Sequence, residues 1–201
     1  MGAATAATLP PLSMRDVHPG HLQAHFPRLS AAAIRQLQEC RRLEDRLGER
    51  LAGVAAAEPE PLVGPARLAL ASPEQIGRAA TAMGAIWHAA SVRACINGAA
   101  VARLVAEVGA EARSAALRHA SLGVAGPEPT EPHELAAAVA RSAEACLAFW
   151  LAALPDGVRR RVLLKLPPGA AGAEDLDGRA APIVAAVVDD LMREEADHDG
   201  P

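Results

Sequence analysis

Aromatic residues are scarce in this 201-residue chain, which has no Tyr and only two Trp and two Phe. Few residues of the types that favour strands are present, so a sheet sandwich is disfavoured. An interior built from Ala, Leu and Val instead favours close contact between helices. We predict an all-α fold, a compact multi-helix domain with Pro/Gly-rich linkers and mobile termini.

Cysteine pairs, targeting signals and a basic excess are also missing. Cys40, Cys95 and Cys146 lie far apart and form no CxxC pair, which fits a reduced protein better than a disulfide framework. The N-terminus lacks the features of a secretory signal, and we find no apolar run that would cross a bilayer. The net charge of −4 disfavours nucleic-acid binding. We therefore predict a soluble, cytoplasmic protein.

The motifs that usually carry catalysis are missing too. There is no phosphate-binding Gly loop, GxSxG elbow, HExxH or paired CxxC. The spacing of His18, His21 and His25 allows a zinc-site hypothesis, but no fourth ligand follows, and a Pro/Gly-bounded turn is the favoured interpretation. His88 and His119 have no carboxylate or nucleophile at matching spacing. We predict no enzyme activity, no cofactor and no bound metal.

The central stretch, residues 72–122, predicts three short helices that form the core. The first begins at Ser72-Pro73, because Ser caps helices and Pro suits the first helical position. Asn97 is expected to cap the second, and Gly109 to end it in a left-handed conformation. The third follows, with an Ala-rich apolar line. Such short helices are unstable alone, so they must pack together.

The flanking segments predict further helices. Residues 30–53 predict one amphipathic helix whose mixed charges form either a solvated face or a partner-docking face. Residues 134–154 predict the most apolar helix, and residues 183–196 predict a last one with a frayed acidic end. Pro- and Gly-rich breaks separate them. We divide the chain into a disordered N-terminus (1–15), a helical domain (16–168), and a mobile linker with a C-terminal amphipathic helix (169–201).

One basic cluster stands out, formed by Arg159, Arg160, Arg161 and Lys165. It could contact phosphate or nucleic acid, but the negative charge of the whole chain favours an acidic protein surface or simple solvation. We take Arg159, Arg160 and Arg161 as the candidate partner-binding residues.

Several blocks, in their order along the chain, resemble the SctK family of type III secretion systems, which includes the YscK and PscK proteins. An early His-Pro block resembles residues 18–22, and a capped-helix block resembles residues 72–85. An Arg-x-x-Ile-Asp-Gly-Ala block resembles residues 93–109, with Asn97 where an acidic cap is expected. A late Arg-x-x-Leu-Lys-Leu-Pro block resembles residues 161–167. The similarity extends over residues 18–168.

The resemblance implies a non-catalytic cytoplasmic adaptor in the sorting platform beneath the injectisome. Such a protein would link the cytoplasmic domain of the SctD-like inner-membrane ring protein to the SctQ-like pod during protein secretion. The alternative is a helical DNA-binding regulator that uses a helix-turn-helix around Asn97-Gly98, although Arg103 is the only obvious base or phosphate contact on the second helix. An enzyme with a site assembled from distant residues is a third hypothesis.

Overall fold

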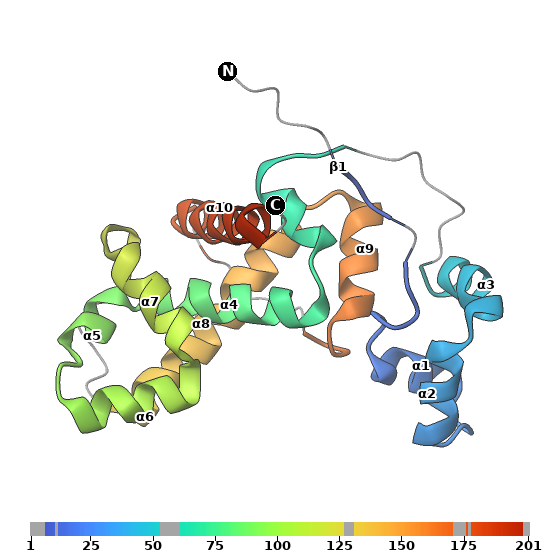
Figure 1. The fold of residues 1–201 in the computed structure, drawn as a ribbon, viewed down its shortest axis with the longest axis horizontal. Coiled ribbons are helices and arrows are strands. Elements are labelled where there is room, and N and C mark those ends of the chain that lie inside the picture. Colours follow the sequence, from blue (N-terminus) through green and yellow to red (C-terminus); the bar gives the residue numbers. More distant parts are fainter. Residues whose placement is uncertain are drawn as a thin grey trace. The chain divides into compact units, whose positions relative to one another are not determined.

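The chain forms two compact units (Figure 1). The computed structural model describes residues 7–10, 12–52, 61–126, 131–170, 176 and 178–198. Unit 1 comprises Met1–Pro73 and Leu151–Ala171, and unit 2 comprises Glu74–Trp150 and Gly172–Pro201. Apart from one pair of two-residue strands, the regular structure of the described residues is helical, which confirms the predicted all-α class.

Unit 1 surrounds a small apolar core. Its elements are β1 (Ala7–Thr8), α1 (Pro19–His25), α2 (Ala31–Glu39), α3 (Arg41–Ala52), β2 (Pro61–Leu62), the 3₁₀ helix η1 (Gly64–Leu70) and α9 (Asp156–Lys165). The two strands pair antiparallel, with Ala7 opposite Leu62. One cluster of buried side chains joins the N-terminal segment to α1 and α2, and it consists of Met14, Val17, Leu22 and Ile34.

The single helix predicted over residues 30–53 is wrong, because the chain forms two helices that meet at Cys40. Ser30 caps the first as expected, accepting a hydrogen bond from the Ala33 N–H at 3.2 Å. Cys40 has φ −84° and ψ 89°, which is not helical. The break allows Leu37 of α2 and Leu47 of α3 to pack against the same cluster.

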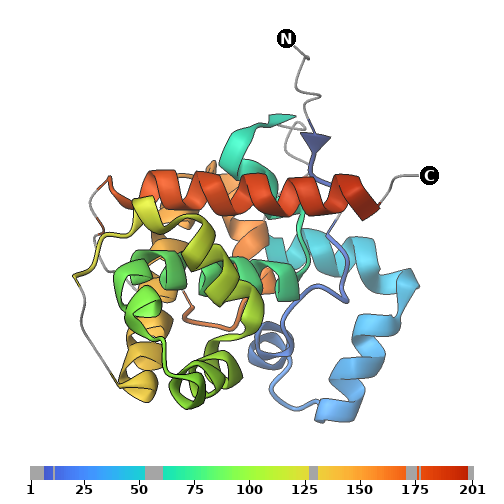
Figure 2. The ribbon, with the colours of Figure 1, turned by 60° about the vertical axis from the view of Figure 1, so that its left-hand side comes forward.

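Unit 2 is built from α-helices and one short 3₁₀ turn. Its elements are α4 (Pro73–Trp87, entering from the last residue of unit 1), α5 (Ala89–Ala94), α6 (Gly98–Val108), α7 (Ala110–Arg118), η2 (Ala120–Leu122), α8 (Pro132–Ala152, up to Trp150) and α10 (Ala180–His198). Small residues fill much of its interior: one buried cluster contains Ala85, Ala89, Val92, Leu104, Ala112, Ala116, Leu135, Ala136 and Val139. Figure 2 shows α10 as one long helix along the top of unit 2.

The central stretch begins and turns where the sequence predicts. α4 begins at Pro73. The Asn97 side chain accepts a hydrogen bond from the Ala99 N–H at 2.9 Å and caps α6. Gly109 ends α6 with φ 88° and ψ 154°, a conformation open almost only to glycine rather than the left-handed helical one expected.

The count of three helices in this stretch is wrong, because α5 is a separate helix after α4. His88 lies between them with φ −100° and ψ 26°. The carbonyl oxygen of Trp87 accepts hydrogen bonds from the N–H groups of Val124 and Ala125 at 3.1 and 3.0 Å. A loop that follows η2 therefore occupies the carbonyl that a continuous helix would offer to Ser91.

α8 is the central apolar helix of unit 2, as predicted. By length and composition it could cross a membrane, contrary to the expectation that no segment could. Its apolar side chains are nevertheless buried in the protein, among them Leu135, Val139, Cys146 and Trp150. α4 crosses it closely at Gly84, where an added Cβ would lie 2.8 Å from the backbone nitrogen of Ala143. The absence of a side chain at Gly84 lets the two backbones approach.

The predicted division at residues 15/16 and 168/169 stays a prediction. Residues 1–6 and 11, the middle of each Pro/Gly-rich break (53–60, 127–130, and 171–175 with 177) and the end of the chain (199–201) lie outside the described residues. Within the predicted N-terminal segment, Ala7–Thr8 form β1 and Met14 is fully buried. α10 continues to His198, beyond the end predicted for the last helix.

Candidate functional site

The three predicted partner-binding arginines lie on α9, and they point in different directions. Arg159 pairs with Asp156 one turn earlier, at 2.5 Å between Nη2 and Oδ1. Arg160 is exposed, whereas Arg161 is half-buried. Successive residues on an α-helix are about 100° apart, so three consecutive arginines cannot share one face. Arg160 and Arg161 keep their guanidinium groups free of ion pairs with described side chains.

Lys165, the fourth member of the predicted basic cluster, is buried and is not part of an accessible basic surface. Its Nζ donates hydrogen bonds to the carbonyl oxygens of Ala69 and Ala71 at 3.0 and 2.8 Å. Burial lowers the pKa of Lys165; the Asp16 carboxylate opposes that shift and the Arg161 guanidinium adds to it. The side chain therefore ties α9 to the end of η1 within unit 1, which is a structural role.

The His-Pro block at residues 18–22 also binds α9, and we call this contact the α9 clasp. The His18 N–H donates to the Leu164 carbonyl at 2.8 Å. His21 Nε2 lies 3.0 Å from the Leu163 carbonyl oxygen and 2.9 Å from that of Leu166. Two acceptors at one ring nitrogen require the proton to sit there. His21 thus satisfies carbonyls that the end of α9 leaves without helical partners.

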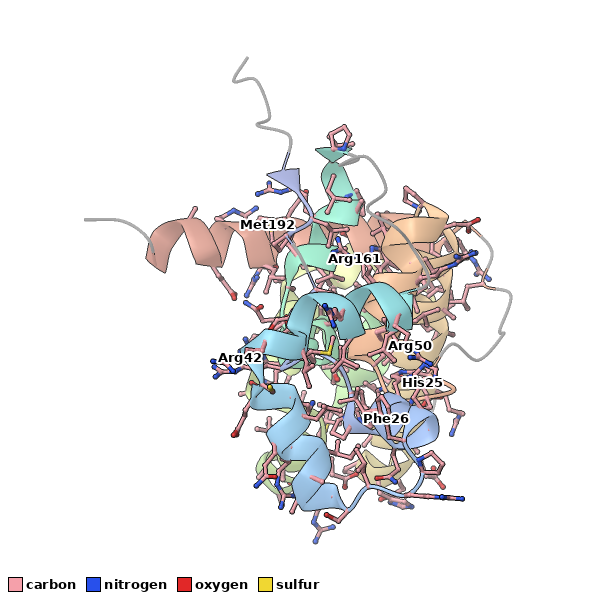
Figure 3. The ribbon with its side chains drawn as sticks, turned by 90° about the vertical axis from the view of Figure 1, so that its right-hand side faces the viewer. His25, Phe26, Arg42, Arg50, Arg161 and Met192 are labelled. Atoms are coloured by element: carbon pink, nitrogen blue, oxygen red, sulfur yellow. The ribbon has the colours of Figure 1, made fainter. Side chains whose placement is uncertain are left out.

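The same geometry bears on the zinc hypothesis for His18, His21 and His25. His18 Nδ1 accepts the N–H of Gly20 at 3.1 Å and caps α1, while His21 Nε2 is a donor. His25 is exposed in the last turn of α1 (Figure 3). Among the described residues, no group of three or more His, Cys, Asp or Glu could hold a metal ion. His18 and His21 thus organise backbone groups of unit 1.

A buried Ser–His pair lies inside unit 2. His88, which is 8% exposed, has its Nε2 3.0 Å from the hydroxyl oxygen of Ser142 on α8. Burial lowers the pKa of His88; the Ala138 backbone opposes this shift, and the positive charge of Arg141 adds to it. A neutral imidazole beside a hydroxyl supplies two of the three groups of a Ser-His-Asp triad. No carboxylate among the described residues bonds to His88, so the orienting acid is missing from this part of the structure.

Among the described residues of unit 2, Asp190 on α10 is the most connected charged group. Its carboxylate accepts from Arg118 and, at 2.8 and 2.9 Å, from His119 and Arg193. The side chain is only 12% exposed. Burial raises the pKa of Asp190, but the hydrogen bonds from His119 and Arg193 and the charge of Arg118 outweigh burial and hold it below its usual range. The group fastens α10 to the end of α7.

The three cysteines of the sequence all lie among the described residues. All three are free, and Cys146 is buried in α8. Burial raises the pKa of Cys146 to about 12, so the thiol stays protonated and behaves as a small apolar group, as its place in the helical pattern predicts.

Sequence reasoning missed the burial of two charged residues that the structure describes, Lys165 and Asp190. Their partners lie 94 and 96 residues away for Lys165, and 71 and 72 residues away for Asp190, apart from Arg193. The helical pattern held one signal for the acid. Asp190 falls three residues after Val187, on the same face as the predicted apolar positions of the last helix.

Comparison with known proteins identifies the relatives of this chain. The family model described as YOP proteins translocation protein K (YscK) matches residues 14–197. Nodulation protein NolU of Rhizobium fredii is 37% identical over 177 residues, which cover 86% of this chain and 82% of NolU. NolU of Sinorhizobium fredii (strain NBRC 101917 / NGR234) matches to the same extent. No solved structure matches this chain.

Proposed function

This chain belongs to the YscK family and is a type III secretion-related protein, and we propose that it is a non-catalytic adaptor of the secretion sorting platform. In this role it links the cytoplasmic domain of an SctD-like ring protein to an SctQ-like pod protein. It acts in the cytoplasm, at the periphery of the inner-membrane apparatus. The two relatives named as nodulation proteins are compatible with a secretion system that serves contact with a host.

The two-unit architecture is the observation that carries this proposal. Each unit has its own buried cluster, one around Met14 and Leu22 and the other around Ala85 and Leu104. An adaptor must offer separate surfaces to two proteins, and two independently packed bodies in one chain provide them. We propose that each unit contacts a different partner.

The polar groups at the centre of each unit support a structural role. Lys165, His21 and Asp190 hold helices together through hydrogen bonds to backbone carbonyls or to other side chains. The Ser142–His88 pair is buried and has no described acid partner. These groups are used within the fold, so partner contacts fall to side chains at the surface, with the exposed Arg160 and the half-buried Arg161 of α9 as the first candidates.

Capture of the two proposed partners by the full-length chain tests this function. The purified protein should retain both the SctQ-like protein and the cytoplasmic domain of the SctD-like protein encoded in the same genome, and the three should form one complex in size-exclusion chromatography. Deleting the gene should stop secretion, and restoring it should recover secretion. Capture of neither partner would contradict the proposal.

Charge reversal tests the predicted arginines. The double variant Arg160→Glu and Arg161→Glu should weaken capture of one partner while far-ultraviolet circular dichroism stays unchanged. Arg103→Glu, an exposed reversal on α6 of unit 2, is the control. Equal capture of both partners by the double variant and the wild type would remove α9 from the contact.

A further inference from the structure

Judged by its described side chains, α3 is the helix of unit 1 that the fold covers least. Among its described side chains none is buried: Arg42, Leu43, Arg46 and Arg50 are exposed, and Leu47, Gly48 and Leu51 are half-buried. Leu43 keeps 39% of its surface exposed. A 12-residue helix is marginal without packing. α3 therefore has apolar and charged surface to offer to another molecule.

Three arginines line one face of this helix. Arg42, Arg46 and Arg50 follow at intervals of four residues. Because each interval advances the helix by about 40° and 6 Å, the three side chains form a row about 12 Å long. None of them makes an ion pair with a described side chain. This row differs from the run on α9, whose members point in different directions.

The row on α3 adjoins α9 within unit 1. The two helices pack side by side, and Figure 3 shows Arg42, Arg50 and Arg161 on the same face of the unit. Arg161 also lies near the buried Lys165, whose pKa its positive charge helps to lower. Arg161 of α9 and the arginine row of α3 thus contribute to one surface, which we call the α3/α9 basic face.

The composition of α3 indicates the chemistry of the partner. Glu44, Asp45 and Glu49 are interspersed among its arginines, and the whole chain carries a net charge of −4. A phosphate backbone or an anionic bilayer binds most strongly to a surface of uniform positive charge. A protein surface, in contrast, can match alternating signs and also bury Leu43. An acidic helix with carboxylates four residues apart would place its charges at the spacing of the arginine row.

We propose that the α3/α9 basic face docks an acidic amphipathic helix of a partner protein. Arg42, Arg46 and Arg50 pair with carboxylates on successive turns of that helix, and Leu43 covers its apolar edge. Identifying the partner with a sorting-platform component rests on the proposed function, whereas the recognition of an acidic helix does not. The two are therefore tested separately.

A synthetic helical peptide tests the recognition itself. The probe is an alanine-based peptide with Glu at every fourth position, and a second peptide carries Lys at those positions. Titration of the full-length protein, followed by amide resonances in NMR spectra, should shift signals of α3 with the Glu peptide only, and added salt should weaken the binding. Equal binding of both peptides, or shifts confined to other helices, would overturn the proposal.

Variants of the full-length protein then locate the contact. R42E/R46E/R50E should bind the Glu peptide at least about tenfold more weakly, because three attractions become repulsions. R42Q/R46Q/R50Q should lie between this variant and the wild type. R35E/R93E/R103E carries the same charge change at exposed positions of α2, α5 and α6 and should bind normally. Comparable loss in this control would overturn the assignment to α3.

Partner capture separates this inference from the proposed function. If the wild type retains the SctQ-like or the SctD-like protein and R42E/R46E/R50E retains it equally, the docking proposal fails while the adaptor function stands. If the wild type retains neither but binds the Glu peptide, the adaptor function fails alone. Binding to phosphatidylglycerol vesicles that the α3 reversal abolishes, without loss of peptide binding, would assign this face to the membrane and overturn the proposal.

Discussion

Gly84 marks the closest approach of two helices in unit 2, and replacing it with alanine should destabilise the protein. A Cβ at this position would overlap the carbonyl oxygen of Val139 and lie 2.8 Å from the nitrogen and 3.0 Å from the Cβ of Ala143. Two of these atoms belong to the backbone of α8 and cannot turn away. Overpacking of this kind costs up to about 3 kcal/mol, and alanine returns about 1 kcal/mol of helix propensity. The expected net loss is about 2 kcal/mol of unfolding free energy.

Gly77 on the same helix supplies a matched control. An added Cβ there meets nothing within 4 Å. Gly77→Ala should therefore gain about 1 kcal/mol from propensity alone. For a chain of this size 1 kcal/mol shifts the melting temperature by about 2–4 °C. We expect Gly84→Ala to melt about 4–8 °C below the wild type, and Gly77→Ala about 2–4 °C above it.

Tryptophan fluorescence is the appropriate assay, because the only two tryptophans of the sequence, Trp87 and Trp150, both lie in unit 2. The signal reports the unit that contains the mutation even if unit 1 unfolds separately. Circular dichroism follows both units and should show the same ordering. A Gly84→Ala protein as stable as Gly77→Ala would refute the close contact between α4 and α8.

Three further predictions concern the polar groups inside the units. Asp190→Asn should cost about 1–3 kcal/mol of unfolding free energy, because three donors lose a charged acceptor. The pKa of Asp190 is lowered in the folded protein, so its contribution to stability is present above the normal carboxyl range and is lost as pH falls through the lowered pKa. The variant should therefore flatten the acid branch of a stability curve followed by fluorescence. His21→Ala should expose two carbonyls at the end of α9 and cost about 1–3 kcal/mol, seen as loss of protection in hydrogen exchange of α9 while α10 keeps its own. The pKa of His88 is lowered in the folded protein, so the unfolded chain binds its proton more readily, and unit 2 should lose stability as pH falls below 6.5. His88→Gln should reduce the dependence of unfolding free energy on pH in this range. An unchanged dependence would show that His88 is not its cause.

The sequence predicted the features that short-range chemistry determines. Helix starts at Pro73 and Asn97, and the turn at Gly109, follow from capping and from the special freedom of proline and glycine at those positions. The long apolar helix around Leu147 was recognisable because its periodic pattern is strong. Such signals need only neighbouring residues and were read correctly.

The features that failed depend on distant segments. Cys40 lies in a stretch with no helix breaker, and only packing against the cluster around Met14 explains the interruption there. The split at His88 depends on a loop that follows η2. The sequence analysis assigned Lys165 to a basic cluster, because the carbonyl on η1 that accepts its hydrogen bond lies almost 100 residues earlier in the sequence. No local pattern contains this information.

The same dependence on distant segments limited the prediction of the candidate site. Arg159, Arg160 and Arg161 attracted attention as neighbours in sequence, although a helix separates neighbours and aligns every fourth residue. The spacing of Arg42 and Arg46 was visible in the sequence, but the break at Cys40 and the contact of α3 with α9 were not. The surface could therefore be assembled only from the fold.

The order in which the chain is made gives the interleaved units a further consequence. Unit 2 is completed by Gly172–Pro201 and unit 1 earlier, by Leu151–Ala171, so unit 1 cannot close until that segment has left the ribosome. Until then α1, α2 and η1 lack the segment that carries Lys165, and their apolar faces remain open on the nascent chain. A premature stop before α10 would release a protein whose first unit is complete and whose second is not. Folding of unit 2 therefore requires synthesis of the segment that carries α10, and a copy that ends before it cannot present both folded units.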